Sequence, residues 1–197
     1  MRPRSSNNGE SFRAVTGVTL IELMVVIAIV AILTTLATPT FSRLIADSAI
    51  KQQTESLMDD LRYARSTALK RGRSVTLCAS ENPTAASPTC KSSDPDWSKG
   101  WIIFIDEDAP LNNTFESTDE LLRRQEALGR SGGIRTGTGG ASGQPPVFLR
   151  FNSDGRTTGL QGSFVFQPAA ADLTLERSIC IATTGRPRIT AVGTTTC

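Results

Sequence analysis

The feature that most constrains this chain is a long apolar run near its N-terminus, VTLIELMVVIAIVAIL at residues 18–33. No charged residue occurs from Leu23 to Ser42. About twenty residues of α-helix extend about 30 Å, which is the thickness of the hydrocarbon layer of a bilayer. The sequence therefore predicts one membrane-spanning helix over residues 18–41.

The charges before this helix predict its orientation. Three basic residues precede it, namely Arg2, Arg4 and Arg13, against the single acidic residue Glu10. Because positive charge stays on the cytoplasmic side, we expect a cytoplasmic N-terminus, a single pass through the inner membrane and a periplasmic C-terminal domain. After Leu36, the residues Pro39 and Phe41 stand where a signal-peptide cleavage site needs small side chains, so the helix is predicted to be retained.

Glu22 is the one charged residue inside the apolar run. A carboxylate at the centre of a lipid-embedded helix costs about 2.5–3.5 kcal/mol, less near an interface, and such a residue usually marks a function. A plain membrane anchor is the simpler interpretation of the run, but it leaves this charge without a purpose.

The N-terminal segment resembles the class III signal of type IV prepilins and type II secretion pseudopilins. It has a short basic leader, residues 1–17, and glutamate as the fifth residue after Gly17, with Pro39 further along. The resemblance implies cleavage between Gly17 and Val18 by a prepilin peptidase, followed by N-methylation of Val18. Most such proteins have phenylalanine where this chain has Val18. The family also implies that Glu22 pairs with the new α-amine of a neighbouring pilin during assembly.

The helical pattern continues beyond the membrane segment. An apolar stripe at spacings of three, four or seven is formed by Ile50, Leu57, Leu61, Ala64 and Ala68 and is widened by Leu44, Met58 and Leu69. Gly72 is a natural C-terminal stop. Residues 42–72 are therefore predicted to form an amphipathic continuation of the helix.

After Gly72 the pattern changes to short β-rich runs between turn residues. These runs span residues 74–79, 100–106, 146–152, 162–168, 177–183 and 187–192. The pattern predicts an α+β, type IV pilin-like fold in which antiparallel sheets of a globular domain, residues 73–197, pack against the long N-terminal helix. A helical turn is expected in DELLRRQEAL, residues 119–128, and a flexible surface connection in the glycine-rich segment 129–146.

The second half of the chain resembles the GspH/FimT branch of the pilin-like proteins. The resemblance rests on LCAS at 77–80, Cys90, DWSKGWIIFID at 96–106 and FNSDG at 151–155. Segment 107–145 lies outside it. We interpret Trp97 and Trp101 as aromatic side chains that pack the sheet onto the helix, with ligand stacking as the alternative.

The chain has no histidine and four cysteines, namely Cys78, Cys90, Cys180 and Cys197. The lack of histidine removes Ser/His/Asp and Cys/His nucleophile arrangements and the commonest zinc ligand, so no enzyme activity and no cofactor are predicted. Four cysteines permit three disulfide pairings. We favour Cys78–Cys90 and Cys180–Cys197 because each closes a short local loop, and a four-cysteine metal site is the alternative.

Two arginines flank a proline near the C-terminus, in the sequence TGRPR at residues 184–188. The first 17 residues account for the formal net charge of +2, so the remainder is neutral and any anion binding must be local. Glycine and proline can hold Arg186 and Arg188 on a rigid tip between two strands, where planar guanidinium groups suit phosphate contacts. A solvated hairpin with two charges is the plainer interpretation.

TGRPR resembles the GRxR motif of FimT-type minor pilins that are implicated in DNA binding during natural transformation. The resemblance implies that Gly185, Arg186 and Arg188 contact double-stranded DNA. Arg156 and Arg177 lie outside the motif and are candidate neighbours that would enlarge the basic patch. The first hypothesis is thus a FimT-like minor pilin assembled into or near a pilus. The alternative is a GspH-like pseudopilin of type II secretion, or a priming minor pilin, in which the arginines serve packing or solubility.

Overall fold

The computed structural model describes residues 17–93, 96–107, 111–136, 147–158, 162–169, 173–194 and 197, with the side chains of residues 35–40 and 173 left out. The first 16 residues of the predicted leader lie outside this part of the chain. The protein divides into two units, Met1–Phe41 and Ser42–Cys197, and each is described separately.

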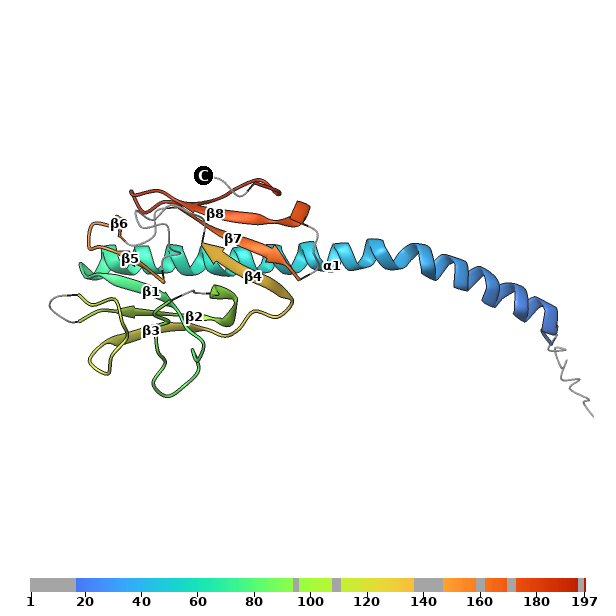
Figure 1. The fold of residues 1–197 in the computed structure, drawn as a ribbon, viewed down its shortest axis with the longest axis horizontal. Coiled ribbons are helices and arrows are strands. Elements are labelled where there is room, and N and C mark those ends of the chain that lie inside the picture. Colours follow the sequence, from blue (N-terminus) through green and yellow to red (C-terminus); the bar gives the residue numbers. More distant parts are fainter. Residues whose placement is uncertain are drawn as a thin grey trace, which may run out of the picture. The chain divides into compact units, whose positions relative to one another are not determined.

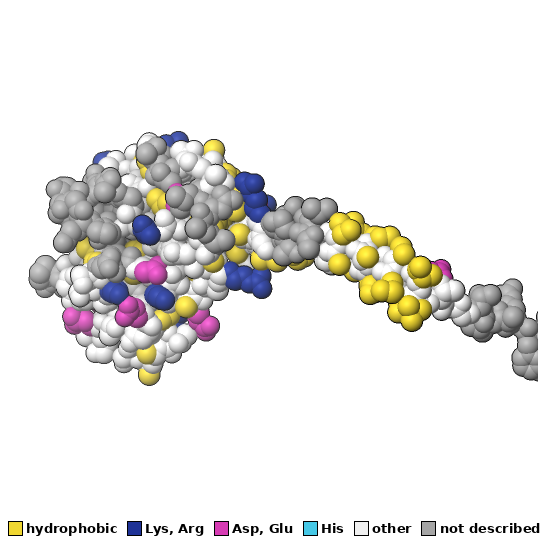
Figure 2. All heavy atoms as spheres, turned by 45° about the vertical axis from the view of Figure 1, so that its right-hand side comes forward, with side chains coloured by type: hydrophobic (Ala, Val, Ile, Leu, Met, Phe, Trp, Pro, Cys, Tyr) yellow, Lys and Arg dark blue, Asp and Glu magenta, His cyan; other side chains and the backbone are white. Residues whose placement is uncertain are grey.

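The N-terminal unit contains the start of helix α1, Leu20–Arg71. Its apolar side chains from Val18 to Leu33 are at least half exposed, and Figure 2 shows them covering the described surface of this unit. Among the residues with described side chains, no helix is long and apolar enough to cross a membrane. The predicted span of residues 18–41 includes residues 35–40, which lie outside those residues.

The globular unit contains the rest of α1 and two antiparallel sheets (Figure 1). The first sheet has the order β3-β2-β1-β5-β6, with β1 Val75–Ala79, β2 Trp101–Ile105, β3 Glu120–Gln125, β5 Phe148–Phe151 and β6 Thr157–Thr158. The second has the order β4-β7-β8-β9, with β4 Ser131–Thr136, β7 Gly162–Pro168, β8 Arg177–Ile181 and β9 Pro187–Ile189. Short 3-10 helices occur at η1 Trp97–Lys99 and η2 Leu173–Leu175. The predicted α+β, pilin-like fold is confirmed, and each of the six expected strand segments contains a strand.

The amphipathic half of α1 forms the centre of the core. The predicted apolar stripe is buried at Ile50, Leu57, Leu61, Ala64, Ala68 and Met58, whereas Leu44 and Leu69 are half exposed or more. The helix ends as expected, because Gly72 adopts a φ of 64° and donates its N–H to the Ala68 carbonyl at 2.9 Å. Both sheets contribute side chains to the same apolar cluster as the helix, so one core joins the three layers.

The central strands β1 and β2 are buried on both faces, which explains why WIIFI in β2 is a continuous apolar run. One face, including Leu77 and Ile103, belongs to the main core. The opposite face, including Ile102 and Phe104, forms a second cluster with Phe115 from the segment between β2 and β3. The first sheet is therefore covered by α1 on one side and by its own connections on the other.

Two disulfides hold these connections and the C-terminus. Cys78 pairs with Cys90 at a Cα–Cα distance of 5.5 Å, and Cys180 pairs with Cys197 at 5.7 Å. Both pairings are those that the sequence favours. The first bond ties the segment after β1 to the outer face of the first sheet, and the second ties the final residue to β8.

The expected helical turn at residues 119–128 is wrong, because Glu120–Gln125 forms strand β3. The segment is rich in good helix formers, but its backbone pairs antiparallel with β2, in the register Trp101 with Gln125. A register shift lies between Ile103 and Phe104 of β2. Pairing along β2 satisfies a row of backbone groups, and this tertiary gain outweighs local helix propensity.

The flexible connection expected over residues 129–146 is wrong for its first part, where Ser131–Thr136 forms strand β4. A Cβ atom at Gly132 would lie 2.1 Å from the Pro168 carbonyl oxygen, and Gly133 has a φ of 120°. The pairing with β7 shifts register between Ser131 and Gly133. The glycines therefore serve a β-bulge with close backbone approach rather than flexibility. Residues 137–146 lie outside the described part of the chain.

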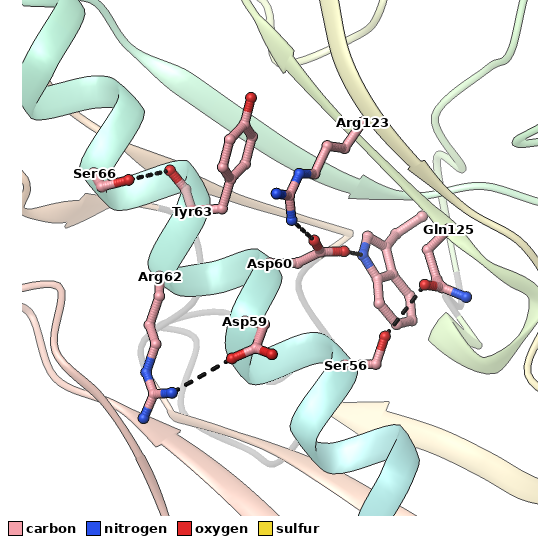
Figure 3. Close-up of polar contacts among 9 residues, drawn as sticks. Ser56, Asp59, Asp60, Arg62, Tyr63, Ser66, Arg123 and Gln125 are labelled. Atoms are coloured by element: carbon pink, nitrogen blue, oxygen red, sulfur yellow. Dashed lines mark hydrogen bonds and ion pairs between the residues drawn. The ribbon is translucent and has the colours of Figure 1, made fainter.

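Trp97 and Trp101 are both fully buried in the main core, which confirms their interpretation as packing residues. The ring of Trp97 meets Phe164 of the second sheet edge to face, with centroids 4.8 Å apart. The Trp101 indole N–H donates to Asp60 Oδ2 of α1 at 2.8 Å. Asp60 Oδ1 accepts from Arg123 Nη1 at 2.9 Å, so one carboxylate links α1 to β2 and β3 (Figure 3).

Asp96 joins the turn before β2 to the second sheet. Its Oδ1 accepts the backbone N–H of Ser98 at 3.0 Å, as the N-cap of η1, and that of Ile134 in β4 at 3.1 Å. Burial raises the pKa of the Asp96 carboxyl, but the hydrogen bonds from Ser98 and Ile134 outweigh it, so the pKa lies below its ordinary value. The charged form of Asp96 thus stabilises the contact between the two sheets.

Candidate functional site

The predicted GRPR tip is the turn between β8 and β9, residues 182–186. The Gly185 N–H donates to the Ala182 carbonyl at 2.8 Å, and the Ala182 N–H donates to the Arg186 carbonyl at 3.4 Å. Gly185 has a φ of 76°, which is the left-handed conformation that glycine adopts without strain. The expected turn is therefore present with glycine at its left-handed position, and Pro187 is the first residue of the strand that follows.

Gly185 is required at this position for a second reason. A Cβ atom there would lie 1.9 Å from the Gly155 carbonyl oxygen and 3.2 Å from Arg65 Nε. The turn is therefore pressed against the neighbouring turn of the first sheet and against α1. No sequence pattern near Gly185 indicates this contact, because its partners are distant in the chain.

Arg186 and Arg188 have exposed side chains at the start of the edge strand β9. Arg186 is the last residue of the turn, and Arg188 is the second residue of β9. Arg188 pairs across the sheet with Cys180, whose side chain lies outside the main core cluster, so Arg188 is on the outer face of the second sheet. Within the described residues, neither guanidinium pairs with an Asp or Glu side chain, and Arg188 Nη2 donates to the backbone oxygen of Cys197 at 3.4 Å.

The two candidate neighbours of this tip differ. Arg156 is exposed in the turn between β5 and β6, directly beside Gly155. Arg177 is instead committed to the helix, because its Nη2 lies 3.1 Å from Asp47 Oδ1 and only 20% of its side chain is exposed. The suggestion that Arg177 enlarges the basic patch is therefore wrong, since an ion pair with α1 already uses its charge.

The predicted processing and assembly residues lie at the start of the described part of the N-terminal unit. Gly17 and Val18 are exposed and precede α1, and Glu22 is in the first helical turn. The Glu22 N–H donates to Thr19 Oγ1 at 3.3 Å, so Thr19 caps the helix. The sequence TLIE carries the signal for this cap, a threonine followed three residues later by glutamate. That signal was missed in the interpretation of Glu22.

A groove of about 820 Å³ lies between α1 and the segment that joins β3 to β4. Gln52, Gln53 and Ser56 line it from the helix, and Leu128 and Arg130 line it from the connection. Arg130 is the sole ionisable residue in its lining, so the groove offers no acid–base pair. In the described part of the chain, no three His, Cys, Asp or Glu side chains are grouped to hold a metal ion.

The N-terminal segment and the fold together define a class of protein. The prokaryotic N-terminal methylation motif matches residues 12–38, and the long helix packed on antiparallel sheets is the architecture of a type IV pilin-like protein. The family model described as type II transport protein GspH matches residues 53–185, which is more than half of the chain. The chain belongs to this GspH family of pilin-like proteins.

Similar solved structures include the type IV minor pilin FimU of Pseudomonas aeruginosa in two crystal forms. The chain is 19% identical to FimU in both. The TM-scores are 0.48 and 0.47, and the similarity covers 77% and 73% of this chain and 92% and 94% of the FimU chains. No curated protein matches the sequence.

Proposed function

We propose that this pilin-like protein is a minor pilin that binds double-stranded DNA without sequence preference, through Arg186 and Arg188, during DNA uptake. The observation that carries the proposal is the exposure of both arginine side chains close together, with Arg186 in the turn and Arg188 in the strand that follows it. Within the described residues, neither arginine pairs with an Asp or Glu side chain. Arginine at such a site can make bidentate contacts to phosphate.

The charge of the chain predicts how this binding behaves. Two arginines on a domain with little net charge neutralise few phosphates, so binding by one copy is weak and falls steeply with salt. Several copies, or other pilins of the same fibre, raise the effective affinity by avidity. Weak single-copy binding is sufficient for a fibre that holds DNA at many points.

The direct test measures DNA affinity of the full chain, purified in detergent, by fluorescence anisotropy with a labelled duplex. Replacing Arg186 and Arg188 with alanine together is expected to weaken binding about 60-fold at 0.1 M salt, because each lost phosphate contact costs about eightfold there. The slope of log affinity against log salt should fall by about 1.8. The charge-matched control replaces Lys51 and Arg62, which are exposed on α1. Equal losses of DNA affinity in the two double variants would refute a specific role of Arg186 and Arg188 in DNA binding.

We also propose a maturation pathway for the N-terminal segment. A prepilin peptidase cleaves between Gly17 and Val18, Val18 is N-methylated, and the apolar helix keeps the protein in the inner membrane until assembly. Support comes from the methylation motif at residues 12–38. The carboxylate of Glu22 then pairs with the α-amine of a neighbouring pilin, and Thr19 begins the helix beside it.

Glu22→Ala separates assembly from processing. The variant is expected to yield the same mature N-terminus, N-methyl-Val18, by mass spectrometry of membrane fractions. Its amount in sheared fibres should fall at least about tenfold, because a helix that loses its charge partner loses about 1.4 kcal/mol or more of contact energy. A variant that entered fibres as well as the parent would contradict the assembly role. A retained leader in the parent would contradict the cleavage site.

A second candidate function is a pseudopilin of type II secretion, and the match to type II transport protein GspH favours it. In that case the arginines of the tip serve solubility or contacts between subunits. Deleting the gene would then abolish protein secretion and leave DNA uptake unchanged, whereas the minor pilin proposal expects the opposite.

A further inference from the structure

Two turns of the same design lie side by side at the tip of the globular unit. One joins β5 to β6 at residues 152–156, and the other joins β8 to β9 at residues 182–186. In each, the glycine N–H donates to the carbonyl of the first residue at 2.8 Å, and the glycine φ is 74° in one and 76° in the other. Each glycine is followed by an exposed arginine, Arg156 or Arg186.

The two turns belong to different sheets but are bonded to each other. Thr157 donates its backbone N–H to the Thr183 carbonyl at 3.2 Å and its Oγ1 hydroxyl to the Ala182 carbonyl at 3.1 Å. The Gly155 carbonyl approaches Gly185 so closely that a Cβ would have no room. The turns therefore form one platform rather than two independent loops.

Arg65 of α1 forms hydrogen bonds to both turns. Its Nε donates to the Gly155 carbonyl at 3.1 Å, and its Nη2 donates to the Thr184 carbonyl at 3.2 Å. The side chain is half-buried, and its two hydrogen bonds span backbone groups of both turns. A planar fork with several donors in fixed directions can span two carbonyls in this way, whereas a lysine ammonium is a single point of charge.

The charges on the platform favour an anion. Within the described residues, neither Arg156 nor Arg186 has a side-chain carboxylate partner. The nearest acidic group in the same turn is Asp154, whose Oδ1 accepts the Arg156 backbone N–H at 3.1 Å. The carboxylate of Asp154 thus supports the backbone of the turn and leaves the Arg156 side chain available.

We infer that the DNA-contacting surface is this two-turn platform, with Arg156 as a further phosphate contact and Arg65 as the residue that positions both turns. The inference rests on the proposed DNA binding by Arg186 and Arg188. It extends that site to a second sheet and gives α1 a part in holding it. Binding would then need three arginines arranged across two sheets, not one flexible hairpin.

The contact by Arg156 is tested with the full chain in detergent and the same labelled duplex. Arg156→Ala is expected to weaken binding about eightfold at 0.1 M salt and to lower the salt slope by about 0.9. The control, Arg62→Ala, removes the same charge from an exposed side chain of α1 that faces Asp59. Asp154→Asn, which keeps the acceptor, should tighten binding. An Arg156→Ala affinity equal to that of Arg62→Ala would overturn the contact.

The positioning role of Arg65 is tested without DNA. Arg65→Lys keeps the charge and removes the fork, so amide hydrogen exchange in residues 152–157 and 182–186 should accelerate about tenfold, as expected from losing about one net hydrogen bond. Arg62→Lys should leave the exchange unchanged. Unchanged exchange in Arg65→Lys would overturn the positioning role, even if DNA binding holds. If the Arg186 and Arg188 variant binds DNA like its control, the proposed function fails while the exchange result still stands.

Discussion

Asp60→Ala is expected to lower the free energy of unfolding of the globular unit by about 2–3 kcal/mol, because it leaves the fully buried Trp101 indole N–H without an acceptor. Urea denaturation followed by tryptophan fluorescence measures this loss. Asp59→Ala is the matched control, since Asp59 is next in sequence, 72% exposed, and paired with Arg62 on the helix surface (Figure 3). The control should change stability by less than about 0.5 kcal/mol.

Arg123, the second hydrogen-bond partner of Asp60, decides how much of this loss of stability comes from the ion pair. Arg123 lies over the Tyr63 ring at 3.7 Å, so its guanidinium keeps an aromatic contact when the carboxylate is removed. Because 45% of the Arg123 side chain is exposed, water can replace the lost ion pair. The loss of stability in Asp60→Ala should therefore come from the buried Trp101 indole N–H, which is left without an acceptor. Asp60→Asn, which keeps one acceptor oxygen, should cost less than Asp60→Ala, and equal costs would show that the ion pair dominates instead.

The helix and its buried face could be predicted because both follow from local periodicity. Ile50, Leu57 and Leu61 are buried as the 3.6-residue repeat requires, and Gly72 ends the helix as its backbone freedom allows. Leu69 has the right spacing but is half exposed, since it lies at the rim of the stripe near Gly155. Periodicity identifies a face, but the edge of that face depends on what covers it.

The strands β3 and β4 could not be predicted, because their formation depends on partners that are distant in sequence. ELLRRQ in β3 has helix-forming residues and pairs with β2, which it follows by about fifteen residues. SGGIRT in β4 has turn-forming glycines and pairs with β7, which comes later in the chain. In both segments local propensity contradicts the tertiary structure, and the tertiary pairing decides.

The candidate site shows the same division. Its motif residues, Gly185, Arg186 and Arg188, are contiguous and could be recognised. Their setting could not, because Gly155 comes from another sheet and Arg65 from the helix, 119 residues before the Thr184 carbonyl it binds. The motif predicts which side chains are exposed, whereas only the fold shows which residues hold their turn in place.

Gly185→Ala is expected to destabilise the globular unit by about 2–5 kcal/mol, which combines two separable effects. An alanine with a φ near 76° pays about 1–2 kcal/mol for the left-handed conformation. Its Cβ would also meet the Gly155 carbonyl oxygen at 1.9 Å, so the two turns must separate at a cost of about 1–3 kcal/mol. Thermal and urea unfolding measure the total.

Gly72→Ala isolates the first effect. Gly72 has a φ of 64°, and a Cβ there would meet nothing within 4 Å, so its substitution should cost only the conformational part. The difference between the two variants then measures how tightly the turns of the two sheets are pressed together. If Gly185→Ala and Gly72→Ala destabilise equally, the two turns separate without measurable cost, and the backbone angle alone accounts for the glycine at position 185. If Gly185→Ala costs more, the platform is rigid, and its arginines are held in place before any anion binds.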